Sequence, residues 1–182
     1  MSGPAPVVRP SRDDDIAAIA AIYGHHVLHG VASFEEAPPG DAEMARRRSD
    51  ILARGLPYLV AERDGNVVGY CYAGPYRPRV CYRFTLEDSI YIDPGEVGRG
   101  IGRALLGNVI ERVTELGYRQ MIAVIGGSET IASIRLHAAL GFAPIGTFPA
   151  VGFKFGRWID SVYMQRPLGP GDTTLPEETK HG

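Results

Sequence analysis

A glycine-rich turn, residues 97–103, joins an apolar strand-like segment to an amphipathic segment, and contains Gly98, Gly100 and Gly102. The backbone N–H groups at such a turn lack partners and lie beside the positive end of the following helix, so together they favour a phosphate or pyrophosphate. Arg99 and Arg103 could add charge-assisted contacts at the rim. The turn predicts an anionic ligand, although the same glycines could serve only a tight strand-to-helix turn.

The spacing of this turn differs from two common phosphate loops. No Lys-Ser or Lys-Thr pair follows Gly102, and position 103 is arginine, so the segment fits neither G-x-x-x-x-G-K-[ST] nor G-x-G-x-x-G. Nucleotide hydrolysis and dinucleotide binding therefore lose support.

Glu87 stands out on the strand-like segment that precedes the turn. Strand alternation over residues 84–92 places one set of side chains on each face of a sheet. One set is Thr85, Glu87, Ser89 and Tyr91, and the other is Leu86, Ile90 and Ile92. Glu87 is thus expected to face a cleft rather than the core, where a carboxylate could remove a proton from an amine. An exposed or ion-paired strand glutamate would give the same pattern.

Three further side chains could take part in chemistry. Arg77 and Arg79 flank Pro78 in a loop between strands, and the planar fork of arginine suits a carboxylate or phosphinate. Loop arginines are also often only solvated. His137, in an apolar helical segment, is by itself more typical of a packing histidine than of a catalytic one.

The elements that must position these residues alternate between strands and helices. Strands are expected at 7–9, 58–62, 67–73, a segment ending at 92, 121–124, 143–147 and 161–165. Helices are expected after Ser11 and at 41–54, 100–116 and 130–140. This order predicts an α/β fold of the α+β type, with a mixed, mostly antiparallel central sheet flanked by helices.

Composition narrows the class of protein. A chain of 182 residues with 45% hydrophobic residues suits a single domain. We expect a flexible N-terminus at 1–6, one domain at 7–168 and a flexible tail at 169–182. The net charge of -2 lacks long single-sign blocks, which favours neither nucleic acid nor membrane as a partner.

The two cysteines, Cys71 and Cys81, form no C-x-x-C and lack a nearby histidine at metal-ligand spacing, so we expect buried, reduced thiols and no metal. No signal-like or membrane-spanning segment is evident, which predicts a cytoplasmic protein.

The glycine turn resembles motif A of the GCN5-related N-acetyltransferase (GNAT) family, which binds the pyrophosphate of acetyl-coenzyme A. Val97 stands where that family usually has Gln or Arg. The resemblance extends from about residue 8 to 168 and is most specific for the phosphinothricin and methionine sulfoximine acetyltransferase branch. The segments that carry it are 73–79 (AGPYRPR), 82–87 (YRFTLE), 122–126 (IAVIG), 133–142 (SIRLHAALGF) and 151–158 (VGFKFGRW).

The resemblance implies roles for individual residues in acetyl transfer. Glu87 matches the catalytic base, His137 a residue that assists proton transfer or protonates the departing thiolate, and Tyr82 an alternative proton donor or substrate contact. The implied substrate contacts are Phe34, Arg77, Arg79, Tyr82 and Lys154. The implied cofactor contacts are Ile90, Tyr91, Ile92, Gly98, Arg99, Gly100, Ile101, Gly102, Arg103 and Ser133, although Thr130 replaces a usual Asn.

The resemblance implies a mechanism and an assembly as well. The strand end at 90–92 would splay from its neighbour to pair with the pantetheine arm, and the acetyl group would pass directly to a small amino-acid-like amine. A homodimer is implied. Acetylation of a protein N-terminus, a lysine or a polyamine remains the nearest alternative, and a non-catalytic acetyl-CoA-binding module is the alternative outside enzymes.

Overall fold

The computed structural model describes residues 5–176, which form a seven-stranded sheet in the order β1-β2-β3-β4-β5-β7-β6. The strands are β1 Val7–Pro10, β2 Tyr58–Arg63, β3 Asn66–Pro75, β4 Thr85–Ile92, β5 Gln120–Gly126, β6 Ala143–Lys154 and β7 Arg157–Pro167. The α-helices are α1 Ile16–His29, α2 Asp41–Leu52, α3 Ile101–Glu115 and α4 Ile131–Ala139. Only β4 and β5 pair in parallel, so the expectation of a single mixed, mostly antiparallel α/β domain is confirmed.

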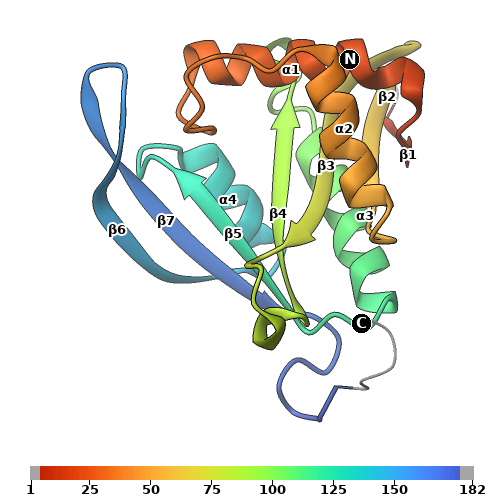
Figure 1. The fold of residues 1–182 in the computed structure, drawn as a ribbon, viewed down its shortest axis with the longest axis vertical. Coiled ribbons are helices and arrows are strands. Elements are labelled where there is room, and N and C mark those ends of the chain that lie inside the picture. The colour runs from red at the N-terminus through yellow and green to blue at the C-terminus, as the bar shows by residue number, and fades with distance from the viewer. Residues whose placement is uncertain (1–4, 177–182) are drawn as a thin grey trace.

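The sheet separates two apolar clusters. Helices α1 and α2 cover one face and α3 and α4 the other (Figure 1). Tyr70 of β3 packs in the cluster under α1 and α2, and its neighbour Cys71 packs in the cluster under α3 and α4, because successive side chains of a strand point to opposite faces. On β4, Tyr91 likewise packs against the cluster under α1 and α2, whereas Ile90 and Ile92 pack against the other cluster.

Strands β4 and β5 separate soon after they meet. Their pairing is limited to Thr85 with Gln120, Leu86 with Met121 and Glu87 with Ile122. Both strands then continue, to Ile92 and Gly126, without pairing to each other. The expected splay is thus confirmed, and Glu87 lies where the opening begins.

The β6–β7 hairpin is longer than the sequence indicated. Strands were expected at 143–147 and 161–165, but β6 runs to Lys154 and β7 starts at Arg157. Most β6 side chains are exposed on both faces, so no alternation of apolar and polar residues marks the strand. The hairpin extends to one side of the molecule, beyond the free end of β5 (Figure 1).

Two smaller expectations were wrong. Helix α1 begins at Ile16 rather than after Ser11, because Ser11 accepts a hydrogen bond from Arg48 and residues 13–15 form a 3-10 turn. Cys81 is exposed, whereas Cys71 is buried as expected, and both are free thiols.

The termini are described only in part. The expected flexible segments lie outside the described residues at 1–4 and 177–182, and their flexibility stays a prediction. Within 169–176, Arg119 donates hydrogen bonds to the carbonyls of Gly171 and Leu175. Across residues 5–176, no helix has the length and apolar character needed to cross a bilayer.

Candidate active site

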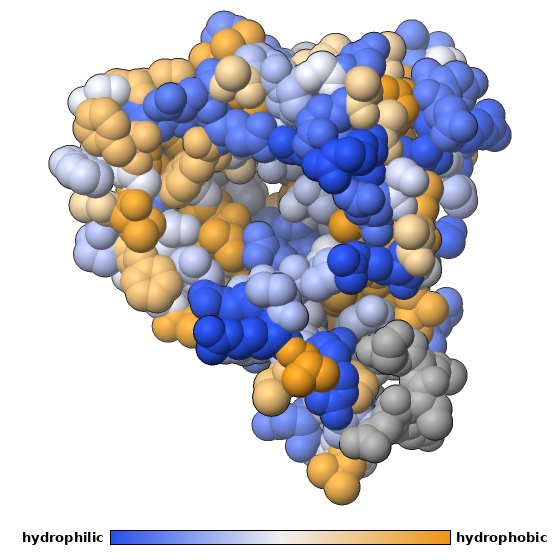
Figure 2. Space-filling view, viewed as in Figure 1, coloured by the Kyte–Doolittle hydropathy of each residue, from blue (hydrophilic) through white to orange (hydrophobic). Residues whose placement is uncertain are grey.

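A cavity of about 1060 Å³ occupies the opening between β4 and β5. Its walls come from the C-terminal halves of both strands, the glycine turn, the start of α4 and the loop between α1 and α2. The face shown in Figure 2 is hollowed near its centre, between the hairpin and α2. Strand separation thus creates a site large enough for an extended ligand.

Glu87 lies at the closed end of this cavity, on the sheet face covered by α1 and α2. Burial, together with the negative charge of Asp88, raises the pKa of Glu87 to about 7, against the opposing effect of Arg77. A carboxylate with such a pKa is partly deprotonated at neutral pH and can both accept and release a proton. Glu87 therefore combines a place in the cavity wall with a pKa near neutrality.

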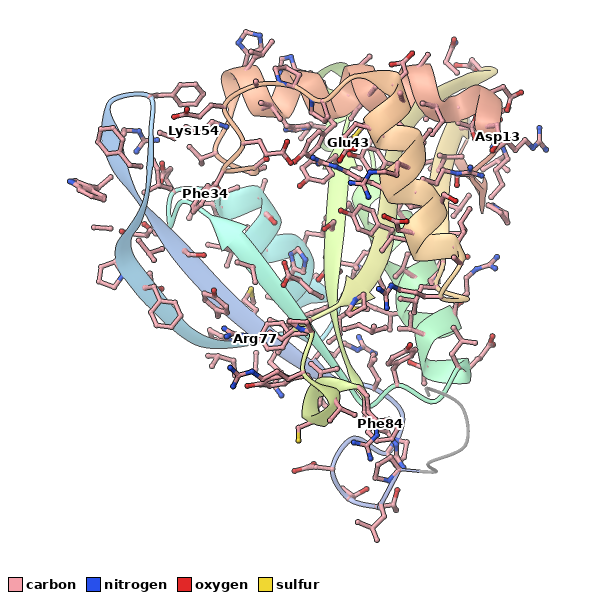
Figure 3. The ribbon with its side chains drawn as sticks, in the orientation of Figure 1. Asp13, Phe34, Glu43, Arg77, Phe84 and Lys154 are labelled. Carbon is pink, nitrogen blue, oxygen red and sulfur yellow. The ribbon has the colours of Figure 1, made fainter. Side chains whose placement is uncertain are left out.

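Arg77 lies close enough to Glu87 to influence its pKa, although neither it nor Arg79 lines the cavity. The Arg77 guanidinium stacks over the ring of Tyr76, 5.1 Å from its centroid (Figure 3 labels Arg77). Tyr82 packs edge-on against the same ring. The structure thus gathers this loop beside the Glu87 end of the cavity, and direct contact of its residues with substrate stays a prediction.

His137 is buried and paired with a residue that the sequence did not single out, Asp88. Its Nε2 lies 3.0 Å from Asp88 Oδ2, and its Nδ1 lies 2.8 Å from the Ser133 carbonyl oxygen. Burial lowers the pKa of His137, but the bond to Asp88 and its charge outweigh this effect and raise it. Both ring nitrogens face acceptors, so the ring connects α4 to β4, and the raised pKa favours its protonated form.

The glycine turn has the backbone shape that an anion cradle requires. Gly98 and Gly100 have φ values of 82° and 80°, and Gly100 caps α3, whose first N–H groups have no partner within the helix. An added Cβ at either position would meet nothing within 4 Å, so the main chain is open to a ligand. Gly102 differs, because its Cβ would lie 3.0 Å from Leu136.

The residues expected to contact the cofactor line the cavity, with one exception. Those present are Ile90, Tyr91, Ile92, Gly98, Gly100, Ile101, Gly102, Arg103 and Ser133. Arg99 lies outside this set, with its Nε 3.6 Å from Glu96. The arrangement fits an extended ligand, with an anionic group at the cradle and a narrow arm between the strands.

Two of the expected substrate contacts are found at the α1–α2 loop, one within the loop and one on the neighbouring strand β6. Phe34 lines the cavity, and Lys154, at the end of β6, lies beside this loop (Figure 3). The Lys154 ammonium donates to the carbonyls of Gly30 and Ser33 and does not line the cavity.

Sequence reasoning missed Asp88 and His26 as site residues. Asp88 is a charged residue on the apolar face of β4, and this break in the pattern was the available signal. His26 Nε2 donates to the Ile92 carbonyl at 2.8 Å, and burial lowers its pKa. The sequence offered only the pair His25-His26, which gives no indication that the second ring reaches β4.

Comparison with known proteins agrees with this geometry. Residues 24–142 match the model of the acetyltransferase (GNAT) family. The chain is 61% identical to a phosphinothricin N-acetyltransferase of Alcaligenes faecalis, over 93% of this chain and 86% of the relative. It is 41% identical to an L-methionine sulfoximine/L-methionine sulfone acetyltransferase of Salmonella typhimurium, over 85% of this chain and 90% of the relative.

A solved structure extends the likeness to the whole chain. A phosphinothricin acetyltransferase from Sinorhizobium meliloti, crystallised with acetyl-CoA, is 49% identical and superposes with a TM-score of 0.94, covering 100% of this chain and 96% of that one. The protein described here belongs to the GNAT acetyltransferase family. It is an acetyl-CoA-dependent N-acetyltransferase.

Proposed function

We propose that this enzyme acetylates the amino group of a small acidic or zwitterionic amino-acid analogue, of the phosphinothricin or methionine sulfoximine and sulfone type. The observation that carries the proposal is Glu87, a carboxylate with a pKa of about 7 at the closed end of the cavity. The acceptor amine must lose its ammonium proton before it attacks the thioester carbonyl, and Glu87 takes that proton.

The acetyl thioester is supplied by acetyl-CoA, whose pyrophosphate the turn at 98–103 would hold. Main-chain N–H groups of β4 beyond Glu87 are free of β5 and can orient the arm and polarise a carbonyl. His137 assists proton transfer to the departing thiolate, with Tyr82 as the alternative donor.

The acidic group of the acceptor is assigned to Arg77 and Arg79. Arg77 influences the pKa of Glu87, and this nearby positive charge supports the assignment. The relatives named above act on phosphinothricin and on methionine sulfoximine or sulfone, which are small amino-acid analogues. A polyamine would be repelled by the same charges.

The enzyme is further proposed to act as a homodimer through the outer surface of the β6–β7 hairpin. Large apolar side chains there are between 56% and 65% exposed, namely Ile145, Phe148, Val151, Phe153, Phe155 and Trp158. Hydrophobic colours gather along the edge of the molecule where the hairpin lies (Figure 2). A continuous exposed apolar surface of this kind is typical of an interface, and a second copy supplies a matching apolar surface.

The proposed location is the cytoplasm, supported by two free thiols. The even charge distribution supports neither nucleic acid nor a membrane as partner.

The proposal is tested by measuring coenzyme A release over a panel of amines. The panel contains phosphinothricin, methionine sulfoximine and sulfone, neutral primary amines, polyamines and a peptide with a free N-terminus. Replacing Arg77 and Arg79 together by Gln removes charge-assisted contacts of about 1.5–3 kcal/mol each, so kcat/KM should fall at least about tenfold for the anionic acceptors. Neutral amines and acetyl-CoA affinity should change little.

Other outcomes would point elsewhere. Equal losses for charged and neutral amines would favour the peptide or polyamine alternative. Binding of acetyl-CoA without turnover of any amine would favour a non-catalytic binding module.

A further inference from the structure

The first part of the loop between α1 and α2, residues 30–35, forms a continuous wall of the cavity, since each of these six residues lines it. The loop follows the last residue of α1, and α1 covers the same sheet face as Glu87. An acceptor that approaches Glu87 from this face must therefore pass along the loop. The position of the loop sets the shape of the acceptor site.

Lys154 attaches this loop to the β6–β7 hairpin. Its Nζ donates to the Gly30 carbonyl at 2.9 Å and to the Ser33 carbonyl at 2.6 Å. The residue is only 2% exposed, and burial lowers the pKa of the ammonium group against the opposing charges of Glu36 and Glu35. The two carbonyls bracket the turn of the loop, so one side chain fixes both of its ends.

Two glycines allow the loop to lie directly on the sheet. A Cβ at Gly126, the last residue of β5, would lie 1.9 Å from the Val31 carbonyl oxygen. A Cβ at Gly152, two residues before Lys154, would lie 2.5 Å from the ring of Phe34. The loop backbone and the Phe34 ring thus rest where any larger residue would displace them.

The opposite side of the loop is tied to its own helices. The Tyr23 hydroxyl lies 2.8 Å from Ser33 Oγ and donates to Glu35, and Arg47 of α2 pairs with the same carboxylate. On the hairpin side, Lys154 holds the loop through its two hydrogen bonds. The loop is thereby held between two parts of the molecule that are far apart in sequence.

We propose that Lys154 is a positioning residue, which holds the α1–α2 loop across the cavity and thereby shapes the acceptor site without contacting the acceptor. The identity of the acceptor rests on the proposed function, but the attachment itself does not. An alternative role, direct reading of a negative charge on the acceptor, requires the ammonium to leave its two carbonyls. The two roles predict different selectivity.

The experiment compares three variants with the wild type. Lys154→Met removes the ammonium and keeps an unbranched side chain, and Gly152→Ala displaces the Phe34 ring without changing charge. Arg157→Met is the matched control, because it removes a cation of the same hairpin whose partner is Glu129 at the surface. Each variant is assayed with one anionic and one neutral acceptor, and amide hydrogen exchange is measured over residues 30–35.

If Lys154 positions the loop, Lys154→Met and Gly152→Ala should lower kcat/KM for both acceptors alike, by about 10- to 100-fold. A shift of the bound acceptor by about 1 Å is enough to cause a loss of this order. Acetyl-CoA affinity should stay unchanged, and exchange at 30–35 should rise in both variants and not in Arg157→Met. A loss confined to the anionic acceptor in Lys154→Met, with Gly152→Ala unaffected, would overturn the proposal in favour of direct contact.

Unchanged exchange at 30–35 in Lys154→Met would overturn the proposal as well. If the wild type acetylated neither acceptor, the proposed function would fail, but the exchange measurement would still decide whether Lys154 holds the loop.

Discussion

Glu87 and Asp88 are adjacent carboxylates on β4 that point to opposite faces of the sheet and meet opposite conditions. Glu87 is half-buried at the closed end of the cavity, and its pKa rises to about 7 because burial opposes its charge. Asp88 is buried on the other face, where one of its oxygens lies 3.0 Å from the His137 ring. The first carboxylate has a pKa near neutrality, and the second is paired with a histidine whose pKa is raised.

The contrast shows that neighbouring carboxylates of one strand can meet different electrostatic surroundings. A buried charge with a partner connects elements, here β4 and α4, while a buried charge without one tends to hold a proton. Asp88 also contributes to the raised pKa of Glu87, so the carboxylate paired with His137 influences the carboxylate proposed as general base. Changing each residue should therefore have effects of opposite kind.

The largest expected effect is on turnover. Glu87→Gln keeps the shape of the side chain and removes its basicity, so kcat should fall by about 10²–10⁴-fold with the fold intact. The loss should shrink at high pH, where more of the acceptor amine is already neutral. Glu111→Gln, at an exposed position of α3, is the matched control. Full activity of Glu87→Gln near neutral pH would exclude the role.

The next effect concerns stability on the other face. His137→Gln leaves the Asp88 charge buried without a cation and should lower the free energy of unfolding by about 3–5 kcal/mol. Adding Asp88→Asn removes that charge, so the double variant should recover much of the loss. Urea unfolding measures both, with His25→Gln as an exposed control.

The pH dependence of this loss has a definite sign. The folded pKa of His137 is raised, so its stabilising contribution is present below pH 6.5 and declines as pH rises through the folded value. Equal stability of His137→Gln and wild type at pH 6 would show that the pair does not hold α4 to β4.

The smallest effect is a gain. The pKa of Glu87 rises from 4.5 in the unfolded chain to about 7 in the folded protein, so ionisation of this carboxylate destabilises the fold as pH rises across that interval. Glu87→Gln removes the penalty and should be more stable than wild type by about 3 kcal/mol well above pH 7, and equal to it well below pH 4.5. Unfolding curves at pH 4.5 and pH 8 decide this, and a less stable variant at pH 8 would contradict it.

The local sequence pattern was enough to predict the orientation of Glu87, but it was not enough to predict the partner of Asp88. Alternation along β4 placed Glu87 toward a cleft, and the glycine turn indicated a helix N-terminus open to an anion. The partnership of Asp88 with His137 joins residues 49 positions apart. It depends on where α4 lands on the sheet, which no local period encodes.

The hairpin shows a second limit of sequence reasoning. Most side chains of β6 are exposed on both faces, and alternation arises only where one face is buried. The role of Lys154 was hidden for a related reason. Its partners are main-chain carbonyls, and these leave no trace in the identity of residues 30 and 33.

The short pairing of β4 with β5 has a consequence for the life of the protein in a cell. Within residues 5–176, these two central strands form no backbone pairs with each other beyond Glu87 and Ile122. A ligand that fills that opening binds the folded state and not the unfolded chain. It therefore stabilises the folded state by mass action, by about 2.7 kcal/mol when its concentration is one hundred times its dissociation constant. The enzyme's resistance to unfolding and proteolysis is then linked to the concentration of the ligand that fills the opening.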